Sequence, residues 1–276
     1  MSAAPAASCR GLVWFEALTA QSGRVSGAPA SVRSADAHIG AELTRCIAVV
    51  SDAAGRFPRA RHGEVGVEEA WSLAGEVRRA MAATPAAPRR ALIAVVDVAS
   101  QAYGRLEEML GIHLACAAAA DAYASARLAG HPVIALLVGR AMSGAFLAHG
   151  YQANRIVALD APGVLVHAMS EEAAARVTRR TVEALRLLGE RITPMAYDVR
   201  SFARLGLVDA LISGVNADAP QPQEVARVRS ALAHAIAQAR AAPTHLAHRH
   251  LSQQARLGRA ASVEVRTRMA AEWDVP

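Results

Sequence analysis

Residues 132–150 read PVIALLVGRAMSGAFLAHG, and this stretch decides the class of fold that we expect. Its first seven residues form a continuous apolar run, as a strand buried on both faces requires. Gly139 is expected to end this strand, and a helix is expected to begin near Ser143. A buried strand followed closely by a helix is typical of parallel sheets covered by helices, so the stretch predicts an α/β protein.

The sequence on both sides of this stretch alternates in the same way. ALIAVVD, residues 91–97, is a second continuous apolar run. Alternating strands and helices predict a parallel sheet with right-handed crossovers. Further strands are expected at 12–18, 46–50, 155–159, 163–166 and 208–212, with a Gly- and Ser-rich loop between the first two; helices are expected at 67–81, 106–128, 170–190 and 195–204.

The two ends of the chain differ from this middle part. We expect residues 1–10 to be disordered and residues 11–222 to form the main domain. Residues 223–276 read as helix only and predict a helical C-terminal extension, which Pro243 divides. No internal repeat is visible.

Composition excludes several kinds of chemistry. All 30 basic residues are arginine, so no Schiff-base lysine, phosphate-loop lysine or biotinyl-lysine can exist on this chain. The net charge is +6, but aromatic residues make up only 4%, so we expect no nucleic-acid partner. No apolar run is long enough to span a membrane. The three cysteines have no metal-ligand spacing, which indicates reduced thiols in a cytoplasmic protein without a metal site.

The junction after the strand at 132–138 is the first candidate site. Small residues at Ser143, Gly144 and Ala145 allow a ligand or another backbone to approach closely. Unpaired N–H groups at a helix start can bind an anion or an oxyanion that forms during a reaction. Close packing between strand and helix would explain the same small residues, so both interpretations stay open.

The loop after the strand at 91–97 is the second candidate site. Asp97 begins the segment DVASQAYG, which ends at Gly104. Ligands of open α/β sheets bind at the carboxyl ends of strands, where both loops are expected. A helix cap or a loop anchor is an equally simple role for Asp97, and we favour it over ligand binding.

Five segments together resemble a known superfamily. VVDVASQAYG at 95–104, the stretch from Gly139 to Gly150, NRIVA at 154–158, LGLVD at 205–209 and RHGE at 61–64 follow the order of motifs in crotonase-fold proteins. The likeness covers residues 40–215. Within the superfamily, the chain resembles the carboxyltransferase subunits of acyl-CoA carboxylases more than other members. When the arginine-rich loop at 56–63 is included, it most resembles the gamma-subunit family of biotin-independent malonate decarboxylases. The resemblance implies the ClpP/crotonase spiral of ββα units with a parallel sheet.

The resemblance also implies an activity and partners. In that family a beta and a gamma subunit together decarboxylate a malonyl thioester, which an acyl carrier protein holds on a CoA-derived, phosphopantetheine-type arm. The chain would carry no cofactor and no biotin, and its partners would include the beta subunit, the carrier protein and a carrier-protein transferase.

The family's site residues can be carried over to this sequence. Backbone groups of Ser143, Gly144 and Ala145 would face the malonyl group and stabilise an enolate, while the partner subunit supplies the main oxyanion hole. The acyl group or its arm would contact these residues: Asp97, Gly104, Gly139, Arg140, Met142, Arg56, Arg59, Arg61 and His62.

The sequence departs from carboxyltransferases at two positions. Gly144-Ala145 stands where they have a Gly-Gly pair, and Ala99-Ser100 replaces their Pro-Gly. Both changes argue against a carboxybiotin pocket.

Three other functions compete with this one. The first is a Clp-like serine hydrolase with Ser143 as nucleophile and His167 as its base, since a nucleophile elbow also lies at a strand-to-helix turn. We expect His149 to be a packed helix residue and not a proton donor. The second alternative is a non-catalytic scaffold subunit. Hydratase or isomerase chemistry would need paired carboxylates, but Glu107 and Glu108 are adjacent on a helix and should diverge.

Overall fold

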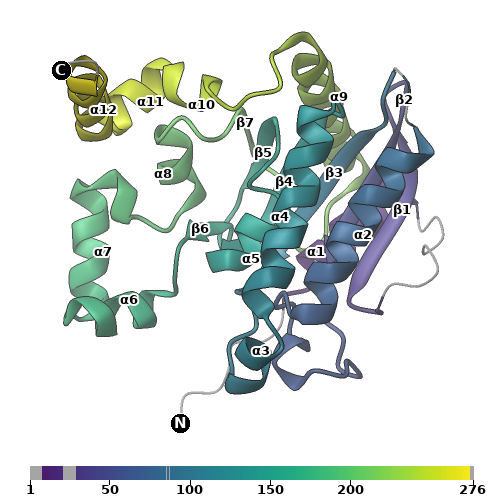
Figure 1. Ribbon diagram of the computed structural model, residues 1–276, viewed down its shortest axis with the longest axis horizontal. Helices are drawn as coiled ribbons and strands as arrows, with labels where there is room; N and C mark the ends of the chain where they lie inside the picture. The colour runs from purple at the N-terminus through teal and green to yellow at the C-terminus, as the bar shows by residue number, and fades with distance from the viewer. Residues whose placement is uncertain (1–7, 21–28, 85, 87, 274–276) are drawn as a thin grey trace.

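The computed structural model describes residues 8–20, 29–84, 86 and 88–273. Its core is a seven-stranded sheet with the order β1-β2-β3-β4-β5-β7, and β6 pairs with the end of β4 (Figure 1). Among the strand pairs of the described residues, only β1–β2 is antiparallel; the other pairs are parallel, as the alternation of strands and helices predicts. The strands are β1 (Val32–Ile39), β2 (Glu42–Val49), β3 (Ala91–Val98), β4 (Val133–Met142), β5 (Arg155–Asp160), β6 (Leu165–His167) and β7 (Ala210–Ser213).

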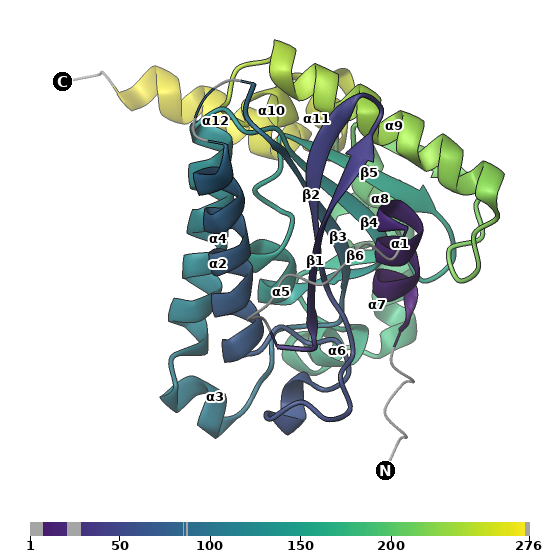
Figure 2. The same cartoon turned by 90° about the vertical axis from the view of Figure 1, so that its right-hand side faces the viewer.

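Helices cover both faces of this sheet, which is why β3 and β4 are apolar along their length. All eight residues of β3 are buried. One face is covered by α2 (Val67–Ala83) and α4 (Ile112–Leu128), and the other by α1 (Arg10–Thr19) and α9 (Pro222–Ala241) (Figure 2). The predicted helix at 67–81 and the strands at 91–97 and 132–138 are thereby confirmed.

The predicted strand at 12–18 is wrong, because these residues form helix α1. Trp14 and Leu18, four residues apart, point to the same side and are at most 1% exposed. The Trp14 indole N–H donates to the Ala217 carbonyl oxygen at 2.9 Å, which ties α1 to the loop before α9. A short apolar run fits a strand and a buried helix equally well, and here tertiary packing decides.

Several predicted boundaries also need correction. Strand β1 was missed because it lies in the expected Gly- and Ser-rich loop, of which residues 21–28 lie outside the described residues. The helix expected at 106–128 is two helices, α3 (Arg105–Met109) and α4, because Gly111 between them has φ +80°. The helix expected at 170–190 is α6 (Glu171–Thr178) and α7 (Val182–Arg191).

The C-terminal half extends away from the sheet in two places. Helices α6, α7 and α8 (Val199–Arg204) form an arm. Helices α6 and α7 share a small apolar cluster around Leu185, whereas α8 packs on the main core through Val199. After α9 come α10 (His248–Leu251), α11 (Gln253–Gly258) and α12 (Ala260–Trp273). Helix α9 packs into the main core through Val228, Leu232 and Ile236. The domain boundary at 222/223 stays a prediction, and of the N-terminal segment expected to be disordered, residues 1–7 lie outside the described residues while Arg10 begins α1.

Candidate active site

Asp97 is a structural anchor between three elements. Strand β4 does not end at Gly139 as expected; it bulges past β3, where Val98 pairs with Ala141, and continues to Met142. The Asp97 carboxylate fills this bulge: its Oδ1 accepts the Arg140 N–H at 3.0 Å, and its Oδ2 accepts the Gly11 N–H in the first turn of α1 at 3.1 Å. Both carboxylate oxygens are therefore engaged within the protein, which supports the anchor role over ligand binding.

The position of the Asp97 carboxylate requires glycine at residue 139. A Cβ atom at position 139 would lie 2.0 Å from Asp97 Oδ1, so any larger residue would expel the carboxylate. Beyond the bulge, Arg140–Met142 pair with β6, which brings His167 next to Met142. Met142 is 5% exposed, so the side chain of this predicted site residue belongs to the core.

The backbone turns sharply at Ser143, the first residue of the short helix α5 (Ser143–Ala148). Ser143 has φ +58°, a left-handed conformation that costs a non-glycine residue about 1–2 kcal/mol. Its hydroxyl group shares a hydrogen bond of 2.7 Å with the Tyr103 hydroxyl. Ser143 and Gly144 are half-buried, whereas Ala145 is fully buried. Position 145 therefore packs against the core, and the accessible part of the junction is Ser143 and Gly144.

The Gly144 amide is not free in this structure. Its N–H donates to the side-chain oxygen Oε1 of Gln101 at 2.7 Å. Gln101 and Tyr103 both lie in the loop after β3, so the two predicted loops do meet at the carboxyl ends of β3 and β4. The sequence marked the segment that contains these two residues, but it gave neither a role, because only the fold places them on the junction.

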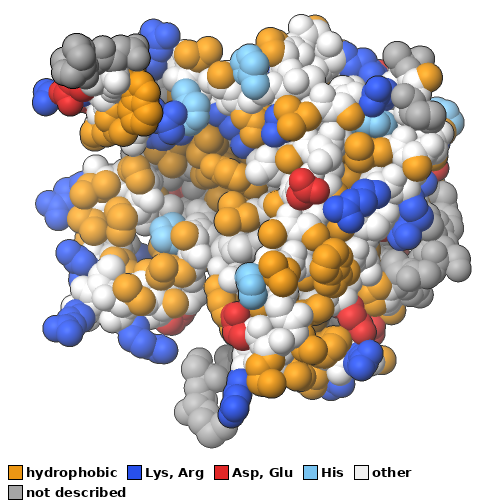
Figure 3. All heavy atoms as spheres, in the orientation of Figure 1, with side chains coloured by type: hydrophobic (Ala, Val, Ile, Leu, Met, Phe, Trp, Pro, Cys, Tyr) orange, Lys and Arg blue, Asp and Glu red, His pale blue; other side chains and the backbone are white. Residues whose placement is uncertain are grey.

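An apolar hollow of about 360 Å³ opens beside the junction, between α5, β6 and α8. Figure 3 shows the surface hollowed between the α6–α8 arm and the body of the molecule. Ser143 and Gly144 form one wall, and His167 lies on β6, the strand that pairs with the end of β4. The remaining lining is mostly apolar: Phe146, Leu147, Tyr151, Val166, Ala168, Pro194, Ala196, Phe202 and Leu205. The junction is thus open to a ligand of acyl size.

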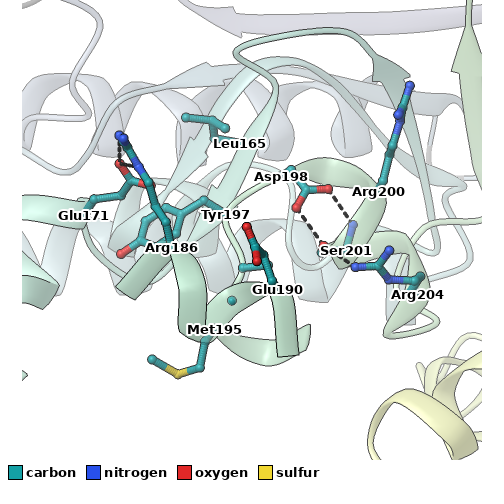
Figure 4. A pocket seen from close by; sticks show the side chains of 12 residues that line it. Leu165, Glu171, Arg186, Glu190, Met195, Tyr197, Asp198, Arg200, Ser201 and Arg204 are labelled. Carbon is teal, nitrogen blue, oxygen red and sulfur yellow. Dashed lines mark hydrogen bonds and ion pairs between the residues drawn. The ribbon is translucent and has the colours of Figure 1, made fainter. Parts of the chain in front are cut away.

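A second hollow, of about 520 Å³, lies beside the first within the arm and shares Ala196 with it (Figure 4). Several of its charged groups are held by contacts within the arm. Arg186 meets Glu171 at 2.7 Å, while Asp198 accepts both the backbone N–H and the hydroxyl of Ser201. These contacts connect α6 to α7 and hold the first turn of α8.

The arrangement of His167 does not suit a catalytic base for Ser143. Its ring stacks on Tyr197 with centroids 3.8 Å apart, and its Nδ1 contacts the Met169 backbone. Burial lowers the pKa of His167. Among the described residues, no hydrogen bond joins His167 to the Ser143 hydroxyl, whose partner is Tyr103. The strained turn resembles a nucleophile elbow in its backbone alone.

His149 is a buried structural residue, as expected. Its Nδ1 shares a 3.0 Å hydrogen bond with the Tyr123 hydroxyl, and its Nε2 lies 3.0 Å from the Val95 carbonyl oxygen. Burial lowers the pKa of His149 to about 4, so the ring is neutral at pH 7. The side chain is completely inaccessible and does not face the hollow.

The arginine-rich loop lies against the loop after β3. Arg59 forms a 3.9 Å ion pair with the buried Glu107, and a Cβ atom at Gly104 would collide with both side chains. Arg56 pairs with Glu68 at 3.5 Å, and the Arg61 guanidinium donates to the Gly55 carbonyl oxygen. The side chains of Arg56 and Arg59 are 78% and 63% exposed, so they remain available to a partner.

Two other predicted features have clear positions. The exposed His62 donates its backbone N–H to Glu64. Glu107 is buried and Glu108 is exposed, so the two carboxylates do diverge as the helix geometry predicts.

The described residues contain no group of three or more side chains arranged to hold a metal ion. None of the helices in that part of the chain carries an apolar stretch long enough to traverse a bilayer.

A distant solved structure has the same fold as this chain. The chain superposes on transcarboxylase 12S with a TM-score of 0.62 at 19% identity, covering 83% of this chain and 40% of that one. At that identity the likeness shows the fold alone. With its mostly parallel sheet and its helices on both faces, the chain therefore has the crotonase fold that transcarboxylase 12S also has.

The family follows from closer matches. The pattern of the malonate decarboxylase gamma subunit matches residues 60–273, so this chain belongs to that family. It is 51% identical, with a TM-score of 0.90, to a chain of the Pseudomonas malonate decarboxylase hetero-tetramer crystallised with coenzyme A, covering 96% of this chain and 99% of that one. The Pseudomonas MdcD–MdcE hetero-dimer gives 50% identity and a TM-score of 0.87 over the same shares.

A curated relative carries a different name. The malonyl-S-ACP:biotin-protein carboxyltransferase MADD of Malonomonas rubra is 33% identical over 178 residues, which is 62% of this chain. The match spans 61% of the length of that relative. The carboxyltransferase likeness predicted from the five segments is thereby confirmed, as is the gamma-subunit family.

Proposed function

We propose that this chain is the gamma subunit of a malonate decarboxylase, which converts a malonyl thioester on an acyl carrier protein to the acetyl thioester and CO₂. The observation that carries the proposal is the 51% identity to a chain of the Pseudomonas hetero-tetramer, over 96% of this chain and 99% of that one. A match of this extent includes the sheet, the junction, the arm and the C-terminal helices together.

The chemistry needs groups that stabilise charge more than it needs a nucleophile. When the bond to the carboxylate breaks, its electron pair moves into the thioester carbonyl and forms an enolate. A proton then adds to the carbon, and the acetyl thioester results. Donors aimed at the enolate oxygen lower this barrier, and removing one donor typically costs about 100- to 1000-fold in rate.

The hollow beside the junction suits the departing group. Its lining is mostly apolar, so a carboxylate directed into it loses hydration, whereas the neutral CO₂ product does not need hydration. Ser143 and Gly144 form the wall at which the bond would break. This wall supports a malonyl group placed across the junction, with its carboxylate toward Phe146 and Leu147.

A partner subunit completes this site in our proposal. Apolar side chains next to the junction are exposed from the loop before α3 to the start of α4, where Figure 3 shows orange side chains. They are Tyr103, Leu106, Met109, Leu110 and Leu114, each at least 49% exposed. A surface of this kind is typical of a protein interface. We assign it to the beta subunit, which would supply the main oxyanion hole.

The carrier protein is the second proposed partner, and a carrier-protein transferase would load it. Arg59 of the arginine-rich loop lies against Gly104 and Glu107, next to the exposed apolar side chains. The exposed Arg56 and Arg59 can therefore meet the phosphate of a phosphopantetheine-type arm or acidic residues of the carrier. The arm belongs to the carrier, and the chain itself would hold neither cofactor nor biotin. A cytoplasmic location stays a prediction.

The test is reconstitution from separate proteins. We expect the purified chain alone to be inactive toward malonyl-carrier protein, and its mixture with the beta subunit to form acetyl thioester. Equal activity of the beta subunit with and without this chain would contradict the proposal and favour a scaffold role.

The serine hydrolase alternative has its own test. Ser143→Ala removes the nucleophile that a hydrolase needs but keeps the backbone donors. We therefore expect the complex with Ser143→Ala to retain decarboxylation within about tenfold, measured as CO₂ release. Complete loss of activity, together with labelling of the wild-type chain by a serine-directed phosphonate, would support the hydrolase instead.

A further inference from the structure

The contact between Gln101 and Gly144 fixes which atom of the glutamine can serve a ligand. A backbone N–H can only donate, so the side-chain atom 2.7 Å from the Gly144 nitrogen must be the oxygen Oε1. The carboxamide nitrogen Nε2 is then the end left over. It donates no hydrogen bond to any described residue, although Gln101 is half-buried. Gln101 does not itself line the apolar hollow, but its carboxamide contacts Gly144, which does. Its Nε2–H therefore stays available to a ligand bound at the junction.

The sequence builds this contact from both sides. A Cβ atom at position 144 would lie 2.9 Å from Oε1 and 3.2 Å from Nε2 of Gln101, so glycine is what admits the carboxamide. The backbone of Gln101 is fixed by Val65, whose N–H donates to Ser100 and whose carbonyl oxygen accepts from Ala102. The space left by glycine at position 144 is therefore occupied by the Gln101 carboxamide. A substrate would have to bind next to that carboxamide.

We propose that the Gln101 carboxamide, through Nε2–H, is the donor that this chain presents to the acyl oxygen of the substrate. The inference rests on the proposed function and replaces the Gly144 amide as the group that contacts the substrate. As CO₂ leaves, the electron pair of the broken bond passes to the thioester oxygen, and Nε2–H donates to that oxygen. The proton that completes the acetyl group adds to carbon and does not come from Gln101.

The Gly144 amide has an indirect role in this arrangement. Its N–H donates to the carbonyl end of the same carboxamide, and linked hydrogen bonds polarise one another, so Nε2–H becomes a stronger donor. The six-residue helix α5 contributes little by itself, because so short a helix has a small dipole.

The test compares two substitutions at one position within the assembled complex. Gln101→Glu keeps an oxygen that can accept from Gly144 N–H but loses the donor, whereas Gln101→Ala loses both. We expect both to lower kcat for decarboxylation of malonyl-carrier protein about 100- to 1000-fold, with KM changed less than about threefold. For Gln101→Glu, kcat should rise again as the pH falls and the introduced carboxyl becomes protonated, because it then regains an O–H donor.

Three results would overturn the inference. Activity of Gln101→Glu near the wild-type level would show that only the acceptor matters, which is a structural role. Higher activity of Gln101→Ala would show that the side chain blocks the Gly144 amide. A fall in kcat for Gln101→Glu without any recovery at lower pH would remove the donor role. An inactive wild-type complex would instead contradict the proposed function, so the two failures can be told apart.

Discussion

Ser143 and Asp97 show what single residues contribute to this site. Ser143 takes a left-handed conformation at the end of β4, and its hydroxyl group contacts Tyr103. Asp97 stabilises the bulge in β4 just before this turn, because its carboxylate accepts the backbone N–H groups of Gly11 and Arg140. The carboxylate therefore fixes where the turn at Ser143 begins, although it does not itself face the hollow.

Gly139 gives a prediction about this anchor. Gly139→Ala places a methyl group against Asp97 Oδ1, so we expect a loss of about 1–3 kcal/mol or more in the free energy of unfolding. Gly75→Ala is the matched control: its Cβ meets only the flexible end of Arg79 at 3.5 Å within helix α2. This control should be neutral or stabilising by about 0.5–1 kcal/mol. Urea denaturation of the isolated chain measures both, and equal stability of the two variants would contradict the anchor role.

His149 gives a prediction about pH. Its pKa is about 4 in the folded chain, below the ordinary value of 6.5, so the unfolded chain binds the proton first as the pH falls. The stability that the neutral ring provides is complete above pH 6.5 and is lost as the pH falls toward 4. Between pH 7 and pH 5 this loss is about 2 kcal/mol.

The measurement is urea denaturation of wild type and of His149→Gln at both pH values. Other histidines titrate equally in the two proteins, so the difference between them isolates His149. An identical dependence on pH in both would show that His149 is not buried as a neutral ring.

At the scale of elements, the sequence predicted the central strands well and the edges less well. The continuous apolar runs at 91–97 and 132–138 were predicted to be strands buried on both faces, and they are β3 and β4. The run at 12–18 is equally apolar, but it packs one helical face on that sheet. Gly139 was expected to end β4 because glycine often ends strands, whereas here it makes room for a carboxylate from β3.

The two candidate loops were predicted to lie at the carboxyl ends of their strands, and the structure shows that they also meet there. The contacts that join them, Gln101 to Gly144 and Tyr103 to Ser143, could not be predicted, because they depend on the bulge between β3 and β4. No pattern of residue types along the chain specifies such a bulge.

Helix α12 yields a prediction at this scale. None of its residues is buried, and Val265, Met269 and Trp273 are at least 55% exposed. Deleting residues 260–276 should therefore change the Tm of the isolated chain by less than about 2 °C, since little apolar surface is lost. Deleting α9 as well, from residue 222, is the contrasting variant and should prevent folding, because Val228, Leu232 and Ile236 fill the main core. A large fall in Tm for the shorter deletion would contradict this division.

At the scale of the whole molecule, the accessible features lie together on one side of the carboxyl ends of β3 and β4. The junction, the apolar hollow, the exposed side chains of α3 and the arginine-rich loop adjoin one another there. The chain offers charge-stabilising donors and an apolar recess but no base bonded to Ser143 among the described residues. Such a face suits one half of a shared active site, with the other half on a second subunit.

The most direct measurement is the rate of acetyl-thioester formation by the complex carrying Gly144→Ala. The added methyl group displaces the flexible Gln101 carboxamide and should leave the backbone in place, so the complex should assemble with its normal mass. We predict a rate at least about 100-fold below that of wild type at saturating malonyl-carrier protein. An assembled complex that works at the wild-type rate would contradict the claim that the acyl group reacts at this junction.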